Sequence, residues 1–300
     1  MRIIVDKLFS VKYQLSGNPD HQKLHSHEDF EIFMFHKGVC RYLINNQIYD
    51  LQPGDILLMD GLALHKPNIP EEGEYIRSHI HFIPEVIEPV LHSMKAIELL
   101  NVFHHSHYLI RTNNSQSIQQ IEEIFKKMDH VDRCKSMMYS EKEWELKFLL
   151  GQMLVWINFL FRDDCLNVSK EFSSKAEHAE KIASYIQHHF QDKITISEIA
   201  YNLCLNKSYV SHVFKEMTGY TIMEYVMACR LKQVKYLLEA EEKKPVQEIA
   251  YESGFENISH FSRYFKEKVG ITPRDYRKKR LEIYNNANND NSLHLSYLKR

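Results

Sequence analysis

The 300-residue sequence has few cysteines, and none of them are paired in a recognisable pattern. There is no CxxC pair and no spacing typical of a zinc site among the five, which are Cys40, Cys134, Cys165, Cys204 and Cys229. This absence excludes a disulfide-stapled scaffold and a zinc finger. It favours free thiols in a reducing compartment.

Long apolar runs are missing as well. The longest, over residues 148–161, is interrupted by Gly151, Gln152 and Asn158, so it is too short and too polar to span a bilayer. The first six residues lack the apolar core of a signal peptide. We therefore expect a cytosolic protein with no membrane partner. The length suggests about two domains.

A strong charge of either sign is also absent, because the net charge is −2. Its distribution says more than its sum. Residues 176–280 carry 17 Lys and Arg against 14 Asp and Glu, whereas the rest of the chain carries 21 against 26. This small basic excess near the C-terminus gives weak support for nucleic-acid binding.

What the chain does contain is a repeat between Thr195 and Arg280. Glu198–Tyr201 recurs as Glu248–Tyr251 at an offset of 50 residues, and residues 214–216 recur as residues 265–267 at an offset of 51. One residue is therefore inserted within the second copy. A motif of short helices that occurs twice suggests a target with a repeating structure, and double-stranded DNA is such a target.

Each copy predicts a helix-turn-helix. The first copy predicts a short helix over 197–203 and a second helix over 207–217, with Asn206 as its N-cap. The second copy predicts helices over 246–251 and 258–269, the latter capped by Asn257 and ended by Gly270.

A single helix over 222–240 joins the two copies. At 1.5 Å per residue it is about 28 Å long. Successive major-groove entries on one face of B-DNA lie about 34 Å apart. A connector of this length can hold two recognition helices in neighbouring grooves.

The N-terminal half predicts short strands and turns over residues 8–83. Asn45-Asn46 separates two apolar-rich runs and predicts a hairpin, and residues 53–55 predict a turn before a strand over 56–59. The pattern favours a small antiparallel barrel or sandwich. Helices are then predicted over 117–128 and 141–161, the second apolar enough to serve both the core and a dimer interface.

A set of histidines and one carboxylate lies among these strands. His25 and His27 are two residues apart, followed by Glu31, Gly38 and, further on, His65. Two residues spaced by two on a strand share a face, and imidazoles with a carboxylate are ligands of non-haem transition metals. His79 and His81 repeat the spacing, and are expected either to line the same cavity or to be partly exposed strand residues. Because the chain has 18 histidines, such a pair can arise by chance, and we give it little weight.

The spacing from His25 to Gly38 resembles the first motif of the cupin barrel, with His65 in a loosened second motif. The resemblance supports the barrel fold more firmly than a metal. We therefore interpret His25, His27, Glu31 and His65 primarily as the lining of a pocket for a small organic effector, with a metal site as the alternative. No cofactor is assigned.

The stretch 196–277 is similar to the DNA-binding domain of the AraC/XylS family of transcriptional regulators. The similarity rests on matched positions along the whole stretch, including Ile199-Ala200, Phe214-Lys215, Arg230-Leu231, Gly254-Phe255, Phe261-Ser262-Arg263 and Tyr276-Arg277. A cupin-like barrel in front of this domain is also the family's common architecture. The resemblance thus implies a multidomain protein: a cupin-like antiparallel β-barrel with appended helices, then an all-α domain with two helix-turn-helix motifs on a long helix.

The resemblance implies a division of roles within each second helix. Base edges are expected to meet the exposed positions Ser208, Ser211, His212, Ile258, Ser259, Ser262 and Arg263. Phosphates are expected to meet Lys207, Lys215, Lys266 and Arg277. Arg263 is the best candidate for a base contact, because a guanidinium can bind guanine O6 and N7 together. A phosphate contact or an internal ion pair is its alternative role.

These expectations define the domains and the function. Residues 1–162 form the sensor and dimerisation domain, 163–176 a linker, 177–280 the DNA-binding domain, and 281–300 a disordered tail. The function is a non-enzymatic, DNA-binding regulator, more often an activator in this family, that acts as a homodimer with a small-molecule effector and RNA polymerase as partners. A metal-binding cupin enzyme or metal sensor fused to a DNA-binding domain is the alternative. The residues suit a sugar, a carboxylate or a peptide fragment equally well as effector.

Overall fold

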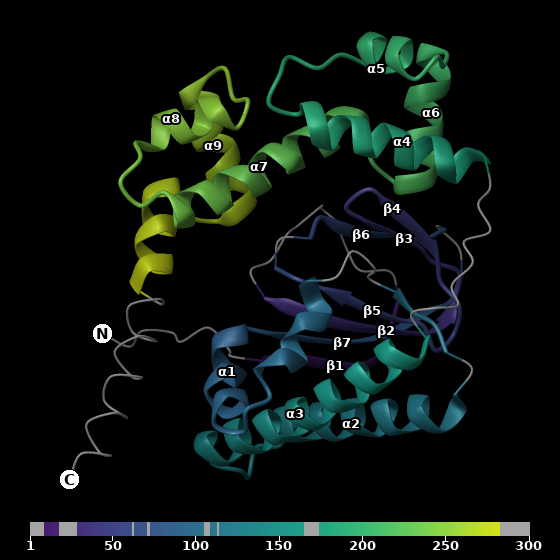
Figure 1. Cartoon of the computed structure of the whole chain (residues 1–300), viewed down its shortest axis with the longest axis vertical. Coiled ribbons are helices and arrows are strands. Elements are labelled where there is room, and N and C mark those ends of the chain that lie inside the picture. Colours follow the sequence, from purple (N-terminus) through teal and green to yellow (C-terminus); the bar gives the residue numbers. More distant parts are fainter. Residues whose placement is uncertain are drawn as a thin grey trace. The chain divides into compact units, whose positions relative to one another are not determined.

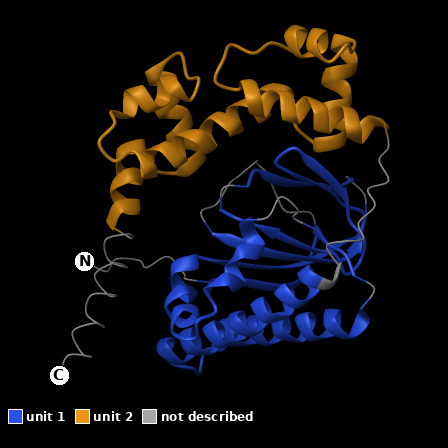
Figure 2. Ribbon diagram, in the orientation of Figure 1, with its two compact units in different colours: residues 1–173 blue, residues 174–300 orange. Residues whose placement is uncertain are grey.

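The computed structural model describes residues 9–17, 29–61, 63–70, 73–104, 109–112, 114–164 and 174–282. The chain divides into two compact units, residues 1–173 and 174–300 (Figure 2). Each unit has its own hydrophobic core.

Unit 1 contains two antiparallel sheets, stacked as separate layers (Figure 1). Sheet A has five strands in the order β1 (Phe9–Ser16), β7 (Tyr75–Phe82), β2 (Phe30–Gly38), β5 (Ile56–Met59) and β8 (Leu109–Ile110). Sheet B has three in the order β4 (Gln47–Asp50), β3 (Arg41–Ile44) and β6 (His65–Asn68).

The turns between these strands follow from local sequence. Asn45 adopts φ +51° between β3 and β4, which asparagine tolerates, so the predicted hairpin is confirmed. The turn before β5 is held by Asp55, whose carboxylate accepts the backbone N–H of Gln52 at 2.7 Å. Arg111, just after β8, binds the same carboxylate through two nitrogens at 2.6 and 2.8 Å. Asp55 is 1% exposed, so this bidentate pair compensates a buried charge.

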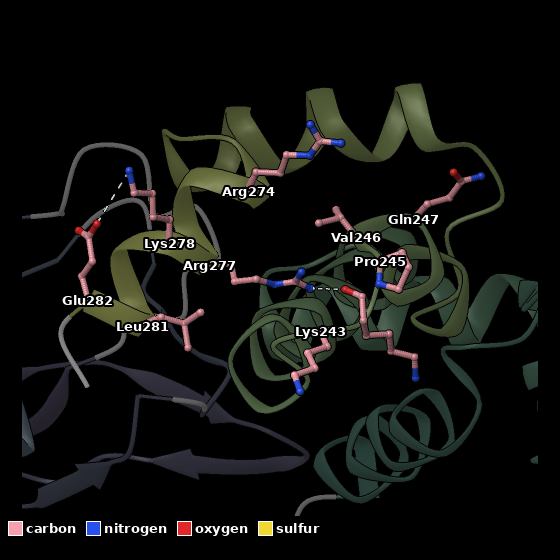
Figure 3. Close-up of a pocket in the computed structure, with 10 residues that line it drawn as sticks. Lys243, Pro245, Val246, Gln247, Arg274, Arg277, Lys278, Leu281 and Glu282 are labelled. Atoms are coloured by element: carbon pink, nitrogen blue, oxygen red, sulfur yellow. Dashed lines mark hydrogen bonds and ion pairs between the residues drawn. The ribbon is translucent and has the colours of Figure 1, made fainter. Parts of the chain in front are cut away.

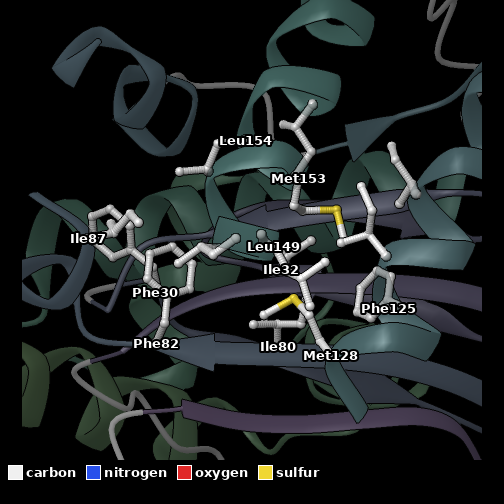
Figure 4. Close-up of a cluster of buried hydrophobic side chains, with 14 of the residues drawn as sticks. Phe30, Ile32, Ile80, Phe82, Ile87, Phe125, Met128, Leu149, Met153 and Leu154 are labelled. Carbon is white, nitrogen blue, oxygen red and sulfur yellow. The ribbon is translucent and has the colours of Figure 1, made fainter. Parts of the chain in front are cut away.

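Alternating side chains of sheet A serve two different cores. On β2, Phe30 and Ile32 face the helices in the larger core (Figure 4), and Met34 belongs to the same core. Phe33 and Phe35 face the other way and join the core between the two sheets. The period of two along a strand produces this division.

Helices cover one face of sheet A (Figure 1). They are α1 (Pro84–Ser93), the 3-10 helix η1 (Ile97–His104), α2 (Ser115–Arg133) and α3 (Tyr139–Asp164). The two predicted helices over 117–128 and 141–161 are confirmed as α2 and α3, each longer than predicted. Leu150, Met153 and Ile157 of α3 are completely buried against the sheet and α2.

Unit 2 is entirely helical in its described part (Figure 1). Its elements are α4 (Ser174–His189), α5 (Ile196–Asn202), α6 (Lys207–Thr218), α7 (Ile222–Ala240), α8 (Val246–Glu252), α9 (Ile258–Val269) and a helical stretch over residues 273–282. The predicted bounds of α7 and α9 are confirmed to the residue. The architecture expected from the sequence, a β unit with helices followed by a double helix-turn-helix, is the one observed.

The predicted linker and tail overlap these elements at their ends. Residues 163–164 complete α3 and residues 174–176 begin α4, while 165–173 lie outside the described residues. Residues 281–282 are helical, and 283–300 lie outside the described residues.

Side chains fix where the helices of unit 2 begin. Thr195 and Thr221 each form a capping box with the glutamate three residues later, at the starts of α5 and α7. Asn206 accepts the backbone N–H of Ser208, and Asn257 accepts that of His260, so both predicted N-caps are confirmed.

The two copies of the repeat share one backbone feature in their turns. Cys204 has φ +54° and Gly254, 50 residues later, has φ +87°. The caps Asn206 and Asn257 are 51 residues apart. The inserted residue of the second copy therefore lies between this left-handed position and the cap.

Candidate DNA-binding surface and effector site

The exposed face of α6 gathers the residues predicted to contact DNA in the first copy. Val213 and Phe214 are completely buried and hold the helix against its neighbours. On the opposite side a shallow hollow of about 720 Å³ is lined by Lys207, Ser208, Ser211, His212, Lys215 and Glu216. The structure thus brings the five predicted positions of this helix onto one surface.

Glu216 is the one acid lining this hollow. Its carboxylate lies 2.8 Å from Nζ of Lys175 on α4 and 3.5 Å from Nε2 of His212. Because Lys175 neutralises it, the hollow carries net positive charge from Lys207 and Lys215. Such a surface suits a phosphate-lined groove.

The second copy presents α9 in the same way. Phe261 and Phe265 are completely buried, whereas Ser259, Ser262, Arg263 and Lys266 are exposed. Ile258 is half-buried and packs against the inner core, which limits the contact it can make with a base. No residue of the described chain forms a hydrogen bond or an ion pair with the Arg263 guanidinium.

Arg277 is placed differently from the other predicted phosphate contacts. Its Nη2 donates to the carbonyl of Lys244 at 2.8 Å and its Nε to the carbonyl of Leu238 at 3.3 Å. Burial lowers the pKa of Arg277. These bonds tie the closing helix to the end of α7, and the predicted phosphate contact stays a prediction.

A basic pocket surrounds Arg277 (Figure 3). It has a volume of about 640 Å³, and four further cations line it: Lys243, Lys244, Arg274 and Lys278. Our sequence reasoning missed these residues. The signal was available, since basic residues are dense in the two short segments 243–244 and 274–280.

In unit 1 the structure brings Glu31 and His65 together between the sheets. His65 Nε2 lies 3.2 Å from Glu31 Oε2, and the two residues are 3% and 5% exposed. His65 Nδ1 lies 2.9 Å from the carbonyl of Ala63, which orients the ring. His25 and His27 lie outside the described residues. Within the part of the chain that is described, no three His, Cys, Asp or Glu side chains are grouped to hold a metal ion.

His81, given little weight from the sequence, joins the same site. Its Nε2 lies 3.3 Å from Glu31 Oε1, and its ring stacks on that of His79 at 4.8 Å. Burial lowers the pKa of His79 to about 4, and the neighbouring Glu31 opposes this effect only in part. The signal in the sequence was the spacing of two residues on a strand.

Comparison with known proteins matches both units. The model described as AraC-like ligand binding domain matches residues 10–141, and the model described as Helix-turn-helix domain matches residues 199–279.

None of the described helices combines the length and apolarity that a membrane crossing requires.

Named relatives match over most of the chain. An uncharacterized HTH-type transcriptional regulator YdeC of Bacillus subtilis is 25% identical over 85% of this chain and 86% of its own. The HTH-type transcriptional activator RhaS of Mannheimia succiniciproducens is 25% identical over 84% of this chain and 88% of its own. Among solved structures, ToxT of Vibrio cholerae is 17% identical, covers 90% of this chain and 98% of its own, and has a TM-score of 0.35.

Proposed function

We propose that this chain, a member of the AraC/XylS family of transcriptional regulators with an AraC-like ligand-binding domain and a helix-turn-helix DNA-binding domain, activates transcription. It does so by placing α6 and α9 in successive major grooves of its operator. The observation that carries this proposal is the exposed polar face on both helices, joined by α7 of 19 residues. A regulator of this kind works beside the chromosome, in the cytoplasm, and an activator meets RNA polymerase there.

Base and phosphate roles divide by chemistry within the two helices. Ser208, Ser211 and His212 on α6, and Ser259, Ser262 and Arg263 on α9, carry the groups that read base edges. Lys207, Lys215 and Lys266 are point charges that suit phosphates and add salt dependence without sequence information. Because the two faces differ, each subunit is expected to read an asymmetric half-site.

The test is a comparison of two neighbouring substitutions on α9, after an operator has been selected from random DNA. Arg263→Ala should relax the base preference at one position, by about 1–3 kcal/mol of discrimination. Lys266→Ala should weaken binding to every sequence alike and reduce the salt slope by about one. Binding to operator variants by fluorescence anisotropy measures both effects. Equal weakening of Arg263→Ala on all sequences would assign that side chain to a phosphate.

We further propose that the protein is a homodimer through the outer face of α3. Four large apolar side chains on it are exposed: Trp144 (60%), Phe148 (68%), Val155 (54%) and Phe159 (42%). At 3.6 residues per turn they fall within an arc of about 60°, on the side opposite Leu149, Met153 and Ile157. A contiguous apolar stripe of this kind suits a protein–protein interface.

The effector is proposed to bind between the two sheets of unit 1, near Glu31, His65 and His81. Its binding then alters the arrangement of the dimer or of the two units, and hence the spacing of the DNA-reading helices. We assign no catalysis to the chain.

The alternative is a metal-dependent enzyme or metal sensor in the same place. The observation behind it is that Glu31 lies 3.2 Å from His65 Nε2 and 3.3 Å from His81 Nε2. These described side chains do not by themselves form a metal-binding group, so a metal would also need the predicted ligands His25 and His27. Metal analysis of protein purified without chelator, with His27→Ala and Glu31→Gln beside it, discriminates the two. Stoichiometric metal that both substitutions remove would replace the organic effector with a metal.

A further inference from the structure

Strand β7 directs a row of polar side chains to the side of sheet A that faces sheet B. Residues spaced by two share a strand face, and Tyr75 of this row belongs to the core between the sheets. Arg77 follows it, 7% exposed, and then His79 and His81. A guanidinium is thus placed in an environment that otherwise excludes water.

Arg77 has no carboxylate partner within the described residues. Its Nη1 donates to the carbonyl of Gly17 at 3.0 Å, and its Cζ lies 4.6 Å from the centre of the Tyr75 ring. One carbonyl and one aromatic face leave most of the five N–H donors of a guanidinium unused. Buried charges are normally paired, because removing a charge from water is costly.

The hydroxyl of Tyr75 is a second polar group in this row without a normal hydrogen bond within the described residues. The residue is 2% exposed, and its hydroxyl has no hydrogen-bond partner of normal geometry in the described chain. The thiol of Cys40 acts on this hydroxyl, but sulfur is a weak partner. A buried hydroxyl without a partner is destabilising.

We propose that Arg77 and Tyr75 bind the carboxylate group of the effector, which is a small organic monocarboxylate. A guanidinium binds a carboxylate through two parallel N–H bonds, and the phenol adds a third donor to the same oxygens. This inference rests on the proposed function, because it takes unit 1 to be the effector-binding unit. Neither residue was singled out by the sequence.

The charges around the site favour a monoanion over a phosphate. Arg77 is the one cation in this row of β7 besides the two histidines, and His79 is kept neutral by burial. Glu31, on the neighbouring strand β2, already places a negative charge close enough to act on the Tyr75 hydroxyl. Lys12 of β1, which pairs with His79, is a second cation beside this row. Arg77, Lys12 and Glu31 together therefore leave one net positive charge, which a monoanion balances and a dianion exceeds.

The experiment is thermal unfolding of the full-length chain with sodium acetate as the probe. Sodium chloride at equal concentration, acetamide and inorganic phosphate are compared with it. At about ten times its Kd, acetate should raise the melting temperature by roughly 3 °C more than chloride. Acetamide, the neutral analogue, and phosphate should behave like chloride.

Three variants make the result specific. Arg77→Met should abolish the acetate shift, and Arg133→Met, an exposed arginine on α2 with 62% side-chain exposure, should retain it. Tyr75→Phe should lose most of the shift while the empty protein melts at the same temperature or higher. If Arg77→Met fails to fold, the loss of the acetate shift in a stably folded Tyr75→Phe still tests the proposal.

The proposal is overturned if acetate stabilises no more than chloride, if phosphate takes its place, or if the acetate shift survives in Arg77→Met or Tyr75→Phe. A lower melting temperature of empty Tyr75→Phe would also overturn it, because the hydroxyl would then have a structural partner. Operator binding by the same proteins is measured separately. If the wild type does not bind DNA, the proposed function is rejected, whereas an acetate shift that depends on Arg77 and Tyr75 still supports the acetate site.

Discussion

A serine, a histidine and a glutamate form a chain of close polar contacts in unit 1. Ser78 is completely buried, and its hydroxyl lies 2.6 Å from Nε2 of His36, whose Nδ1 lies 3.0 Å from Glu122 Oε1. The order serine, histidine, carboxylate is that of a hydrolase triad. Here the backbone N–H of Gln14 also donates to the serine at 2.9 Å, so the hydroxyl is sealed from any substrate and the relay joins α2 to sheet A.

His79 carries a pH dependence that follows from its burial. Burial lowers its pKa from 6.5 to about 4, so the unfolded chain takes up this proton before the folded chain does. The stability contributed by neutral His79 is therefore complete above pH 6.5 and is lost as the pH falls towards 4. The free energy of unfolding should fall by up to about 1.4 kcal/mol per pH unit in that window.

Urea unfolding of the full chain across this range measures the effect. His79→Gln should flatten the dependence, although His36, whose pKa burial also lowers, keeps part of it. His92→Gln, at an exposed position of α1, is the matched control. An unchanged slope in His79→Gln would show that the acid sensitivity arises elsewhere.

Residues whose role depends on their neighbours in sequence could be predicted, and those whose role depends on the fold could not. Asn206 and Asn257 cap helices through backbone groups two or three residues away, so a local pattern revealed them. Arg77 and Tyr75 gain their importance only because β7 lies beside β2 and faces sheet B. The sequence shows neither the pairing of β7 with β2 nor the packing of sheet A against sheet B.

Among the elements, the turn of the second helix-turn-helix is the most tightly constrained. Gly254 has φ +87°, and a Cβ there would lie 2.8 Å from Nε of Arg230 and from the carbonyl oxygens of Phe190 and Gln191. Arg230 itself, on α7, donates to the Phe190 carbonyl at 2.7 Å. The turn between α8 and α9 thus packs directly on α7 and on the chain that follows α4.

Substituting Gly254 and Gly270 in turn should distinguish the steric cost of an added Cβ from the cost of its left-handed backbone conformation. Gly270 has the same φ of +87° with no atom within 4 Å of an added Cβ. Gly270→Ala should therefore cost only the left-handed conformation, about 1–2 kcal/mol. Gly254→Ala should cost clearly more, because two backbone carbonyls must move as well.

Chemical denaturation of the two variants, followed by helical circular dichroism, gives the comparison. Cys204, at φ +54° in the first copy, already shows that a side chain is tolerated in that turn. Equal destabilisation by both substitutions would mean that the close contacts of Gly254 relax without cost.

At the scale of the whole molecule, helix α3 is the element on which the proposed homodimer depends. Helix α3 has buried residues on one side and an exposed apolar stripe on the other. The periodicity of its sequence indicated an apolar surface wider than one core requires. Only the packed structure separated the two faces, because the inner one is defined by contact with sheet A and α2.

A charge in the outer stripe should dissociate the proposed dimer without unfolding unit 1. Phe148→Glu is expected to give a monomeric mass in sedimentation at concentrations where the wild type is dimeric. The melting temperature of this variant should equal that of the wild type diluted to its monomeric form. Met94→Glu, at an apolar position 67% exposed outside α3, should leave the mass unchanged. A monomeric wild type would remove the proposed interface.

The two faces of α3 also impose a thermodynamic relation. In the proposed homodimer, one helix would border both the core behind sheet A and the contact with a second subunit. An effector that strengthens subunit association by some factor must itself be bound more tightly by the dimer, by that same factor. The apparent affinity for the effector would then increase with the amount of regulator in the cell, so that the expression level of the protein sets the threshold at which it senses its ligand.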